Sequence, residues 1–146
     1  MILIDTNVIS EFMNASPTDS VRAWLNAQDP VTLYLPAIAI AEISFGLGVL
    51  PTGRRRTLLS ERFERFIALV FQERILGFDA AATRVYGEIR AHRRAEGRPI
   101  SNFDAQIAAI ARTAGLAVAT RNVRDFDDCG VQVLNPFEVQ AGAPRD

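Results

Sequence analysis

The sequence predicts an α/β fold in which a parallel sheet is covered by helices on both faces. Short apolar runs bounded by turn-forming residues alternate with longer segments in which apolar residues recur every three or four positions. The chain has 146 residues, enough for one domain and too few for two ordinary ones. Hydrophobic residues make up 49% and charged residues 23%, which is typical of a globular protein with a full core.

The N-terminal half begins with the apolar run Ile2-Leu3-Ile4, which is closed by Asp5-Thr6-Asn7. These three residue types favour helix N-caps over strand interiors, so a strand, a sharp turn and a helix are expected. The segments predicted next are a helix over Ser20–Ala27, a strand over Val31–Leu35 stopped by Pro36, and a largely buried helix over Ala37–Leu50 that ends near Gly46 or Gly48.

The C-terminal half continues the alternation after the breaker Pro51-Thr52-Gly53. An amphipathic helix is expected where apolar residues keep helical spacing, from Arg54 to Glu73. It is followed by a strand at Ile75–Phe78, a helix capped by Asp79, a helix at Ala105–Ala114 opened by Ser101–Asp104, and strands at Leu116–Thr120 and Val131–Leu134. We predict one domain over 1–138 and a tail over 139–146.

Two aspartates stand where such a fold places its sites, in the crevice beyond the carboxyl ends of the strands. Asp5 follows the first strand directly, although it could equally cap the next helix. Asp104 is the fourth residue of Ser101-Asn102-Phe103-Asp104, which fits a capping box with aspartate in place of Glu or Gln. Taken alone, Asp104 is better explained as part of a helix cap.

Glu42 is the only charge in the apolar stretch from Ala37 to Phe45. A buried, unpaired carboxylate is strongly disfavoured, so Glu42 either has a buried arginine partner or projects into a cleft, and we favour the cleft. Asp5, Glu42 and Asp104 could then converge, and a cation would relieve their repulsion. All-oxygen ligation suits Mg²⁺ or Mn²⁺, which can polarise a phosphoryl oxygen and generate hydroxide near neutral pH.

The chain lacks the residues that several other kinds of active site require. The chain has no lysine, which excludes a Walker A loop, and its one histidine and one cysteine exclude a zinc cluster and leave no triad to test. His92 lies in an arginine-rich segment and is expected to be exposed. Arginines cluster at 54–56 and at 90, 93, 94 and 98; a solvated face is the simpler explanation, but these patches also suit a polyanion.

Four blocks of sequence occur in an order that resembles the PIN-domain proteins, and most of all the VapC/FitB type of bacterial toxin. They are Ile2–Ile9, Ala41-Glu42, Asp104 with Ile107-Ala108-Ala109, and Ala119-Thr120-Arg121-Asn122 with Asp125-Phe126. The resemblance covers the chain from Met1 to about Phe137. It implies a three-layer α/β/α sandwich with a five-stranded parallel sheet.

The resemblance also implies a Mg²⁺- or Mn²⁺-dependent ribonuclease. Its acidic triad would be Asp5, Glu42 and Asp104, with Asp5 and Asp104 as the principal metal ligands and Thr6 and Thr120 supporting them by hydrogen bonds. Many family members have a fourth acid where this chain has Asn122, so one well-bound ion is expected, and Asp125 could contribute instead. The implied partners are RNA, a VapB/FitA-like antitoxin at the groove near Arg54–Glu73, and a second copy in a homodimer or higher assembly.

Two alternatives stay open. A PIN fold weakened at Asn122 could act mainly as a binding module, through an antitoxin complex that binds operator DNA. A small metal-dependent phosphatase is the third possibility. The N-terminus has no basic segment typical of a signal peptide, and no apolar run is long enough to span a bilayer, so we expect a cytoplasmic protein without membrane contact.

Overall fold

The computed structural model describes residues 1–138, and the tail predicted for 139–146 lies outside the described residues. A five-stranded sheet runs through its centre in the order β3-β2-β1-β4-β5, and every neighbouring pair is parallel. The predicted α/β fold with a five-stranded parallel sheet is therefore confirmed. The strands are β1 (Ile2–Ile4), β2 (Leu33–Pro36), β3 (Ile75–Leu76), β4 (Ala117–Ala119) and β5 (Val133–Leu134).

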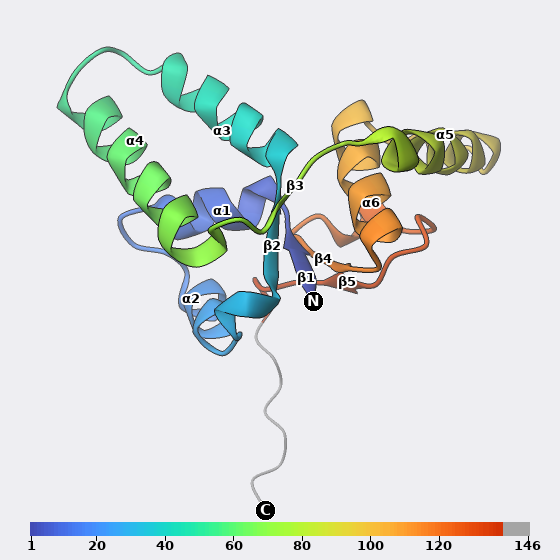
Figure 1. Cartoon of the computed structure of the whole chain (residues 1–146), viewed down its shortest axis with the longest axis horizontal. Coiled ribbons are helices and arrows are strands. Elements are labelled where there is room, and N and C mark those ends of the chain that lie inside the picture. The colour runs from blue at the N-terminus through green and yellow to red at the C-terminus, as the bar shows by residue number, and fades with distance from the viewer. Residues whose placement is uncertain (139–146) are drawn as a thin grey trace, which may run out of the picture.

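Helices cover both faces of the sheet, which makes three layers (Figure 1). One face carries α5 (Ala80–Ala95) and α6 (Asn102–Ala114). The other carries α1 (Thr6–Met13), α2 (Asp19–Asn26), α3 (Ala37–Gly48) and α4 (Arg54–Phe66), the last continuing as a π-helix over Ile67–Phe71. Short 3₁₀ turns lie at Pro30–Thr32 and Val123–Phe126.

The alternation of side chains in β1 produces the two cores. Leu3 packs among the residues of α5 and α6, and Ile4 packs with α1, α3 and α4. Successive residues of a strand point to opposite faces, so an uninterrupted apolar run is what a doubly covered strand requires. Val118 and Ala119 of β4 divide between the two cores in the same way.

The element boundaries differ from the expected ones in a few places. Pro30 starts a 3₁₀ turn, so β2 begins at Leu33 instead of Val31 and includes Pro36 as its last residue. Strands β3 and β5 are shorter than predicted. Between residues 1 and 138, no helix combines the length and the apolar character needed to cross a membrane.

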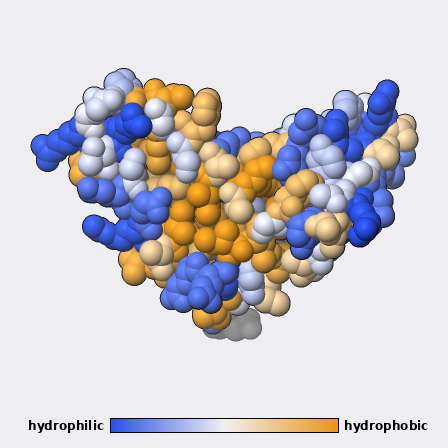
Figure 2. Space-filling view, turned by 45° about the horizontal axis from the view of Figure 1, so that its top comes forward, coloured by the Kyte–Doolittle hydropathy of each residue, from blue (hydrophilic) through white to orange (hydrophobic). Residues whose placement is uncertain are grey.

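The prediction that the Ala37–Leu50 helix is largely buried is wrong. Only Ala39 and Ile43 of α3 are buried, and Phe45 and, just beyond the helix, Val49 are 71% and 65% exposed. The helix is apolar on nearly all sides, but the rest of the chain covers one face of it alone. Hydrophobic side chains gather in the hollow between the two lobes of the molecule (Figure 2).

Candidate active site

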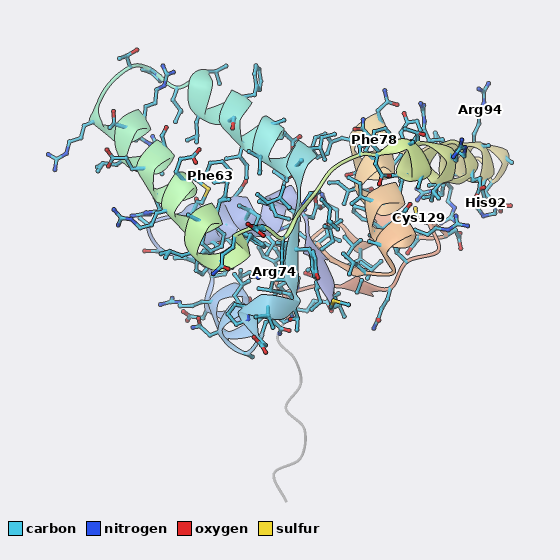
Figure 3. The ribbon with its side chains drawn as sticks, in the orientation of Figure 1. Phe63, Arg74, Phe78, His92, Arg94 and Cys129 are labelled. Atoms are coloured by element: carbon cyan, nitrogen blue, oxygen red, sulfur yellow. The ribbon has the colours of Figure 1, made fainter. Side chains whose placement is uncertain are left out.

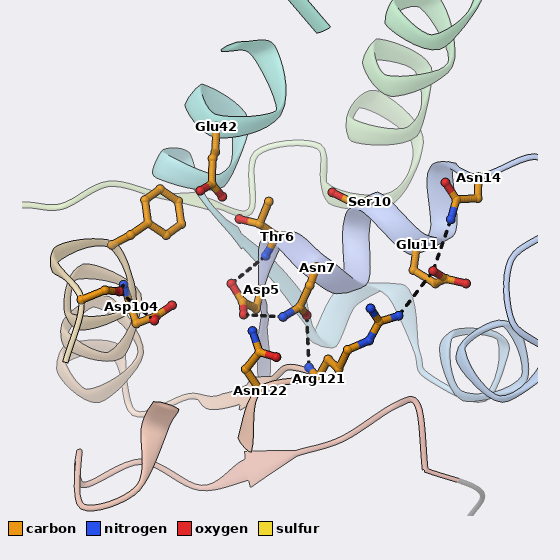
Figure 4. A pocket seen from close by; sticks show the side chains of 12 residues that line it. Asp5, Thr6, Asn7, Ser10, Glu11, Asn14, Glu42, Asp104, Arg121 and Asn122 are labelled. Carbon is orange, nitrogen blue, oxygen red and sulfur yellow. Dashed lines mark hydrogen bonds and ion pairs between the residues drawn. The ribbon is translucent and has the colours of Figure 1, made fainter. Parts of the chain in front are cut away.

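A polar cleft opens at the edge of the sheet where β1 and β4 end. The N-terminal turn of α1, one side of α3 and the start of α6 face one another across it (Figure 4). The carboxyl ends of parallel strands and the N-termini of the following helices meet at this edge, as the crevice rule predicts. The side chains that line the cleft are Asp5, Thr6, Asn7, Ser10, Glu11, Asn14, Glu42, Ser101, Phe103, Asp104, Arg121 and Asn122.

Asp5 combines the two roles that the sequence left open. It is the N-cap of α1, because its Oδ1 accepts a hydrogen bond of 2.7 Å from the Thr6 amide. Its side chain lines the cleft, and its Oδ2 accepts from Thr120 Oγ1 at 2.7 Å and from Asn7 Nδ2 at 3.2 Å. Asp5 is only 4% exposed, and burial raises the pKa of its carboxyl group to about 6, with smaller contributions from the charges of Asp104 and Glu42.

Asp104 likewise serves in a helix cap and lines the cleft. Ser101, the N-cap of α6, accepts a hydrogen bond of 3.1 Å from the Asp104 amide, as predicted. The Ser101 hydroxyl in turn donates to Asp104 Oδ2 at 2.7 Å, which orients the carboxylate. Partial burial raises the pKa of Asp104, and the negative charge of Asp125 raises it further.

Glu42 lies on the side of α3 that faces the cleft. It is exposed, and within residues 1–138 it makes no ion pair, so the buried arginine considered as its partner is not found there. Glu42 therefore lines the cleft as expected, but not for the reason given: the helix that carries it is mostly exposed, so burial does not force its carboxylate into the cleft.

The residues at the ends of β1 and β4 form one hydrogen-bonded network. Thr120 is fully buried; its hydroxyl donates to Asp5 and accepts from Asn7 Nδ2 and from the Asn122 amide at 3.2 and 3.1 Å. The Asn122 side chain lines the cleft, whereas Asp125 lies outside its lining. Thr6 differs from Thr120, because its buried hydroxyl has no hydrogen-bond partner among the described residues.

Asn7 belongs to the site, although in the sequence it is predicted only as part of the signal that starts a helix. Its amide group bridges Asp5 and Thr120, and its Oδ1 accepts a hydrogen bond of 3.1 Å from the Arg121 amide. Its place two residues after Asp5, in the first turn of the helix, was the available signal. Arg121 was also missed, because it stands apart from the arginine clusters that drew attention.

The simpler expectation for the arginine clusters was a solvated face, and Arg93 is an exception to it. Arg93 of α5 is 5% exposed and donates to the carbonyl oxygens of Arg98, Asp125 and Asp127 at 2.7 to 2.9 Å. It ties the end of α5 to the loop after β4. The neighbouring His92 and Arg94 project from the outer part of α5, away from the cleft (Figure 3).

The side chains that line the cleft are of the kind that bind a divalent metal ion. Its acidic groups offer oxygen atoms only, Asp5 is desolvated, and the Thr6 hydroxyl is buried without a partner. The spacing is wider than a preformed cage, because the described residues include no group of three or more His, Cys, Asp or Glu side chains placed to hold one ion together. Direct ligation by two carboxylates, with water completing the shell, suits this spacing and the hydration that Mg²⁺ retains.

Comparisons with known proteins agree with this architecture. The PIN domain family model matches residues 2–131. The chain is 43% identical to VapC ribonuclease Y4jK of Sinorhizobium fredii and 40% identical to toxin FitB of Neisseria gonorrhoeae, in each case over 94% of this chain and 99% of the relative. The solved structure of FitAB bound to an IR36 DNA fragment contains a chain that superposes with a TM-score of 0.90 at 38% identity, covering 96% of this chain and 98% of that one. The chain therefore belongs to the PIN-domain family, within its VapC/FitB group.

Proposed function

We propose that this protein is a Mg²⁺- or Mn²⁺-dependent endoribonuclease that acts as the toxin of a type II toxin–antitoxin pair. The observation that carries the proposal is the meeting of Asp5, Glu42 and Asp104 in one cleft at the carboxyl edge of the sheet. A relative of nearly the same length is named a VapC ribonuclease and another a toxin, and PIN-domain ribonucleases in general depend on a divalent metal.

In this proposal Asp5 and Asp104 are the metal ligands. Thr120 and Asn7 hold the Asp5 carboxylate from one side, and Ser101 holds that of Asp104. Both pKa values are raised, so each ionised carboxylate gains from a neighbouring cation. A bound divalent ion supplies Lewis-acid polarisation of a phosphoryl oxygen and lowers the pKa of water.

Glu42 acts from the opposite wall. Because it is exposed and free of an ion pair within residues 1–138, its carboxylate can position a water molecule or accept a proton from it. The Thr6 hydroxyl is the further donor that could orient a ligand or water in the cleft. Asn122 offers a neutral carbonyl oxygen, which supports one tightly held ion and leaves a second one weakly bound.

A cognate VapB/FitA-like antitoxin is the proposed protein partner. A second, more apolar groove runs between α1, α3 and α4 and is lined by residues that include Met13, Ile43, Leu47, Leu50 and Leu59. Thr6, Ser10, Asn14 and Glu42 line both this groove and the acidic cleft, so the two are continuous. An amphipathic segment in the groove would therefore reach the cleft and block it. The FitAB structure contains DNA, and we propose that DNA contacts this protein only through the antitoxin.

A homodimer is the proposed assembly, with higher assembly in the presence of antitoxin. The exposed side chains of Phe45 and Val49 at α3 form an apolar surface of the kind that a second copy covers. We expect the protein to act in the cytoplasm, where RNA and an antitoxin would both be available.

The test is cleavage of RNA by the purified protein in Mn²⁺, in Mg²⁺ and in EDTA. We expect cleavage with either metal and none in EDTA, and a loss of at least 100-fold, on the order of one catalytic group, in Asp5→Ala and Asp104→Ala. Asp79→Ala is a matched control, because Asp79 caps α5 outside the cleft. Undiminished cutting by Asp5→Ala or Asp104→Ala would refute the assignment.

The second candidate is a binding module that acts through an antitoxin–operator DNA complex and cleaves nothing. The neutral Asn122 in the cleft and the DNA in the FitAB structure favour it. Expression without antitoxin separates the two functions. Growth arrest that Asp5→Ala abolishes supports the ribonuclease, whereas growth arrest that Asp5→Ala leaves intact supports binding. A phosphomonoester assay tests the third possibility, a phosphatase.

A further inference from the structure

We propose that Arg121 is the residue that binds the RNA phosphate at the mouth of the acidic cleft. This inference rests on the proposed ribonuclease function and names the group that receives the substrate. Arg121 follows the last residues of β4, and its side chain extends along α1 toward Glu11 (Figure 4). Its backbone amide donates to Asn7, which places it directly beside the Asp5 network.

The cleft is strongly acidic apart from Arg121. The cleft lining contains four acidic side chains, Asp5, Glu11, Glu42 and Asp104, and Arg121 is the single basic residue among them in the described chain. A phosphodiester that enters this cleft meets repulsion from every wall except that one. A polyanion therefore needs either a cation from solution or this guanidinium to approach the carboxylates.

The guanidinium of Arg121 is held in place but keeps its N–H donors available. The Phe137 ring stacks on it, with 3.9 Å from Arg121 Cζ to the ring centroid, and Glu11 Oε2 lies 3.6 Å from Nη2. Within residues 1–138 the side chain makes no hydrogen bond, and it is 53% exposed. A planar guanidinium supported on one face by an aromatic ring presents its N–H edge to solvent, which is the geometry for bidentate binding of phosphate oxygens.

Glu11 is constrained in a way that favours this role. It accepts hydrogen bonds from the Thr18 amide and hydroxyl at 2.9 and 2.6 Å, and these bonds lower its pKa. Glu11 thus stays ionised and fixed by its own partners, and its pairing with Arg121 at 3.6 Å is long for a hydrogen bond. The arginine is oriented by this contact without having its donors consumed by it.

The experiment measures binding of a short, fluorescently labelled single-stranded RNA to the full-length protein in EDTA, at several salt concentrations. We expect Arg121→Gln to weaken binding about tenfold and to reduce the slope of log K against log salt by about one. Arg124→Gln is the matched control, because Arg124 is an exposed arginine three residues further along the chain that does not line the cleft. The affinity of this variant for the RNA should stay within about twofold of the wild type.

Arg121→Lys is the second variant, and it decides the matter if Arg121→Gln does not fold. Lysine keeps the charge but loses the planar contact, so we expect the wild-type salt slope and an affinity reduced about threefold. Equal losses in Arg121→Gln and Arg124→Gln, or wild-type affinity in Arg121→Lys, would overturn the assignment. If the wild type neither binds nor cuts RNA, the ribonuclease function itself fails, and this assignment with it.

Discussion

The hydroxyl of Thr120 donates a hydrogen bond of 2.7 Å to Oδ2 of Asp5, joining the ends of two adjacent strands that lie 115 residues apart in the sequence. Thr120 is fully buried, and the bond is one of the two main factors that keep the pKa of Asp5 from rising further. The same hydroxyl accepts hydrogen bonds from Asn7 Nδ2 and from the Asn122 amide, so one buried side chain connects the Asp5 carboxylate to both residues.

Replacing Thr120 with valine tests this relationship. The change removes a donor from Asp5 and an acceptor from Asn7 and from the Asn122 amide, so we expect a loss of about 2 kcal/mol in the free energy of unfolding. The pKa of Asp5 should rise above its wild-type value, and RNA cleavage near pH 6 should fall more than cleavage at pH 8. Urea denaturation and a pH–rate profile measure the two effects. Thr113→Val, at an exposed position on α6, should change neither the free energy of unfolding nor the pH–rate profile.

The stability of the metal-free protein should fall as the pH rises from about 4 to about 6. The pKa of Asp5 is about 6 in the folded chain and its ordinary value is 3.8, so between these values the folded state holds more protons than the unfolded one. The contribution of Asp5 to the free energy of unfolding is fully present below pH 3.8 and is lost as the carboxyl group ionises in the folded chain. The difference is about 2–3 kcal/mol, and Asp104, whose pKa is also raised, adds to it with the same sign.

Asp5→Asn isolates that contribution, because the amide does not titrate. In EDTA, we expect the wild type minus variant difference in unfolding free energy to fall between pH 4 and pH 6 and to level off above. A difference that is flat or rises over this interval would contradict the raised pKa. Glu11, whose pKa is lowered, contributes with the opposite sign below its ordinary value in both proteins and so cancels in the comparison.

Local sequence patterns were sufficient to predict most strands and helices. They also placed Asp5 and Asp104 at the edge of the sheet where the strands end. The uninterrupted apolar run Ile2-Leu3-Ile4 predicts a strand that is covered on both faces. Asp5 comes directly after that strand, which predicts its place at the carboxyl edge of the sheet. The spatial order of the strands was not predicted, because it depends on pairing between residues such as Leu3 and Val118 that are distant in sequence. The exposure of α3 was misjudged for a related reason, since composition shows that a helix can be covered but not what covers it.

Arg93 illustrates the same limit at one residue. Its neighbours Arg94 and His92 are exposed, and the sequence offers no sign that Arg93 faces inward. Its position becomes clear only when the loop after β4 supplies the carbonyl groups of Asp125 and Asp127 as acceptors. These acceptors belong to backbone, so any sequence in that loop would provide them, and no motif marks the pairing.

Arg93 should therefore contribute strongly to stability. Arg93→Met keeps much of the apolar stem but leaves three carbonyl oxygens without their donors, and we expect a loss of about 3 kcal/mol in the free energy of unfolding. Arg94→Met, on the adjacent exposed position, should change it by less than about 0.5 kcal/mol. Chemical denaturation measures both. Equal, small effects would mean that Arg93 is solvated in solution.

The number of metal ions depends on the neutral residue at position 122. The cleft is lined by the neutral Asn122 and by the carboxylates of Asp5, at the end of β1, Asp104, at the start of α6, and Glu42, on α3. We expect calorimetric titration with Mn²⁺ to give one ion per chain, with affinity that falls below pH 6 as Asp5 takes up a proton. Asn122→Asp adds a charge at the cleft and should tighten the binding of a second ion, whereas Asn135→Asp, outside the cleft lining, should leave the stoichiometry at one. Two tightly bound ions in the wild type would contradict the single-ion site, because the amide would then be contributing what we assign only to a carboxylate.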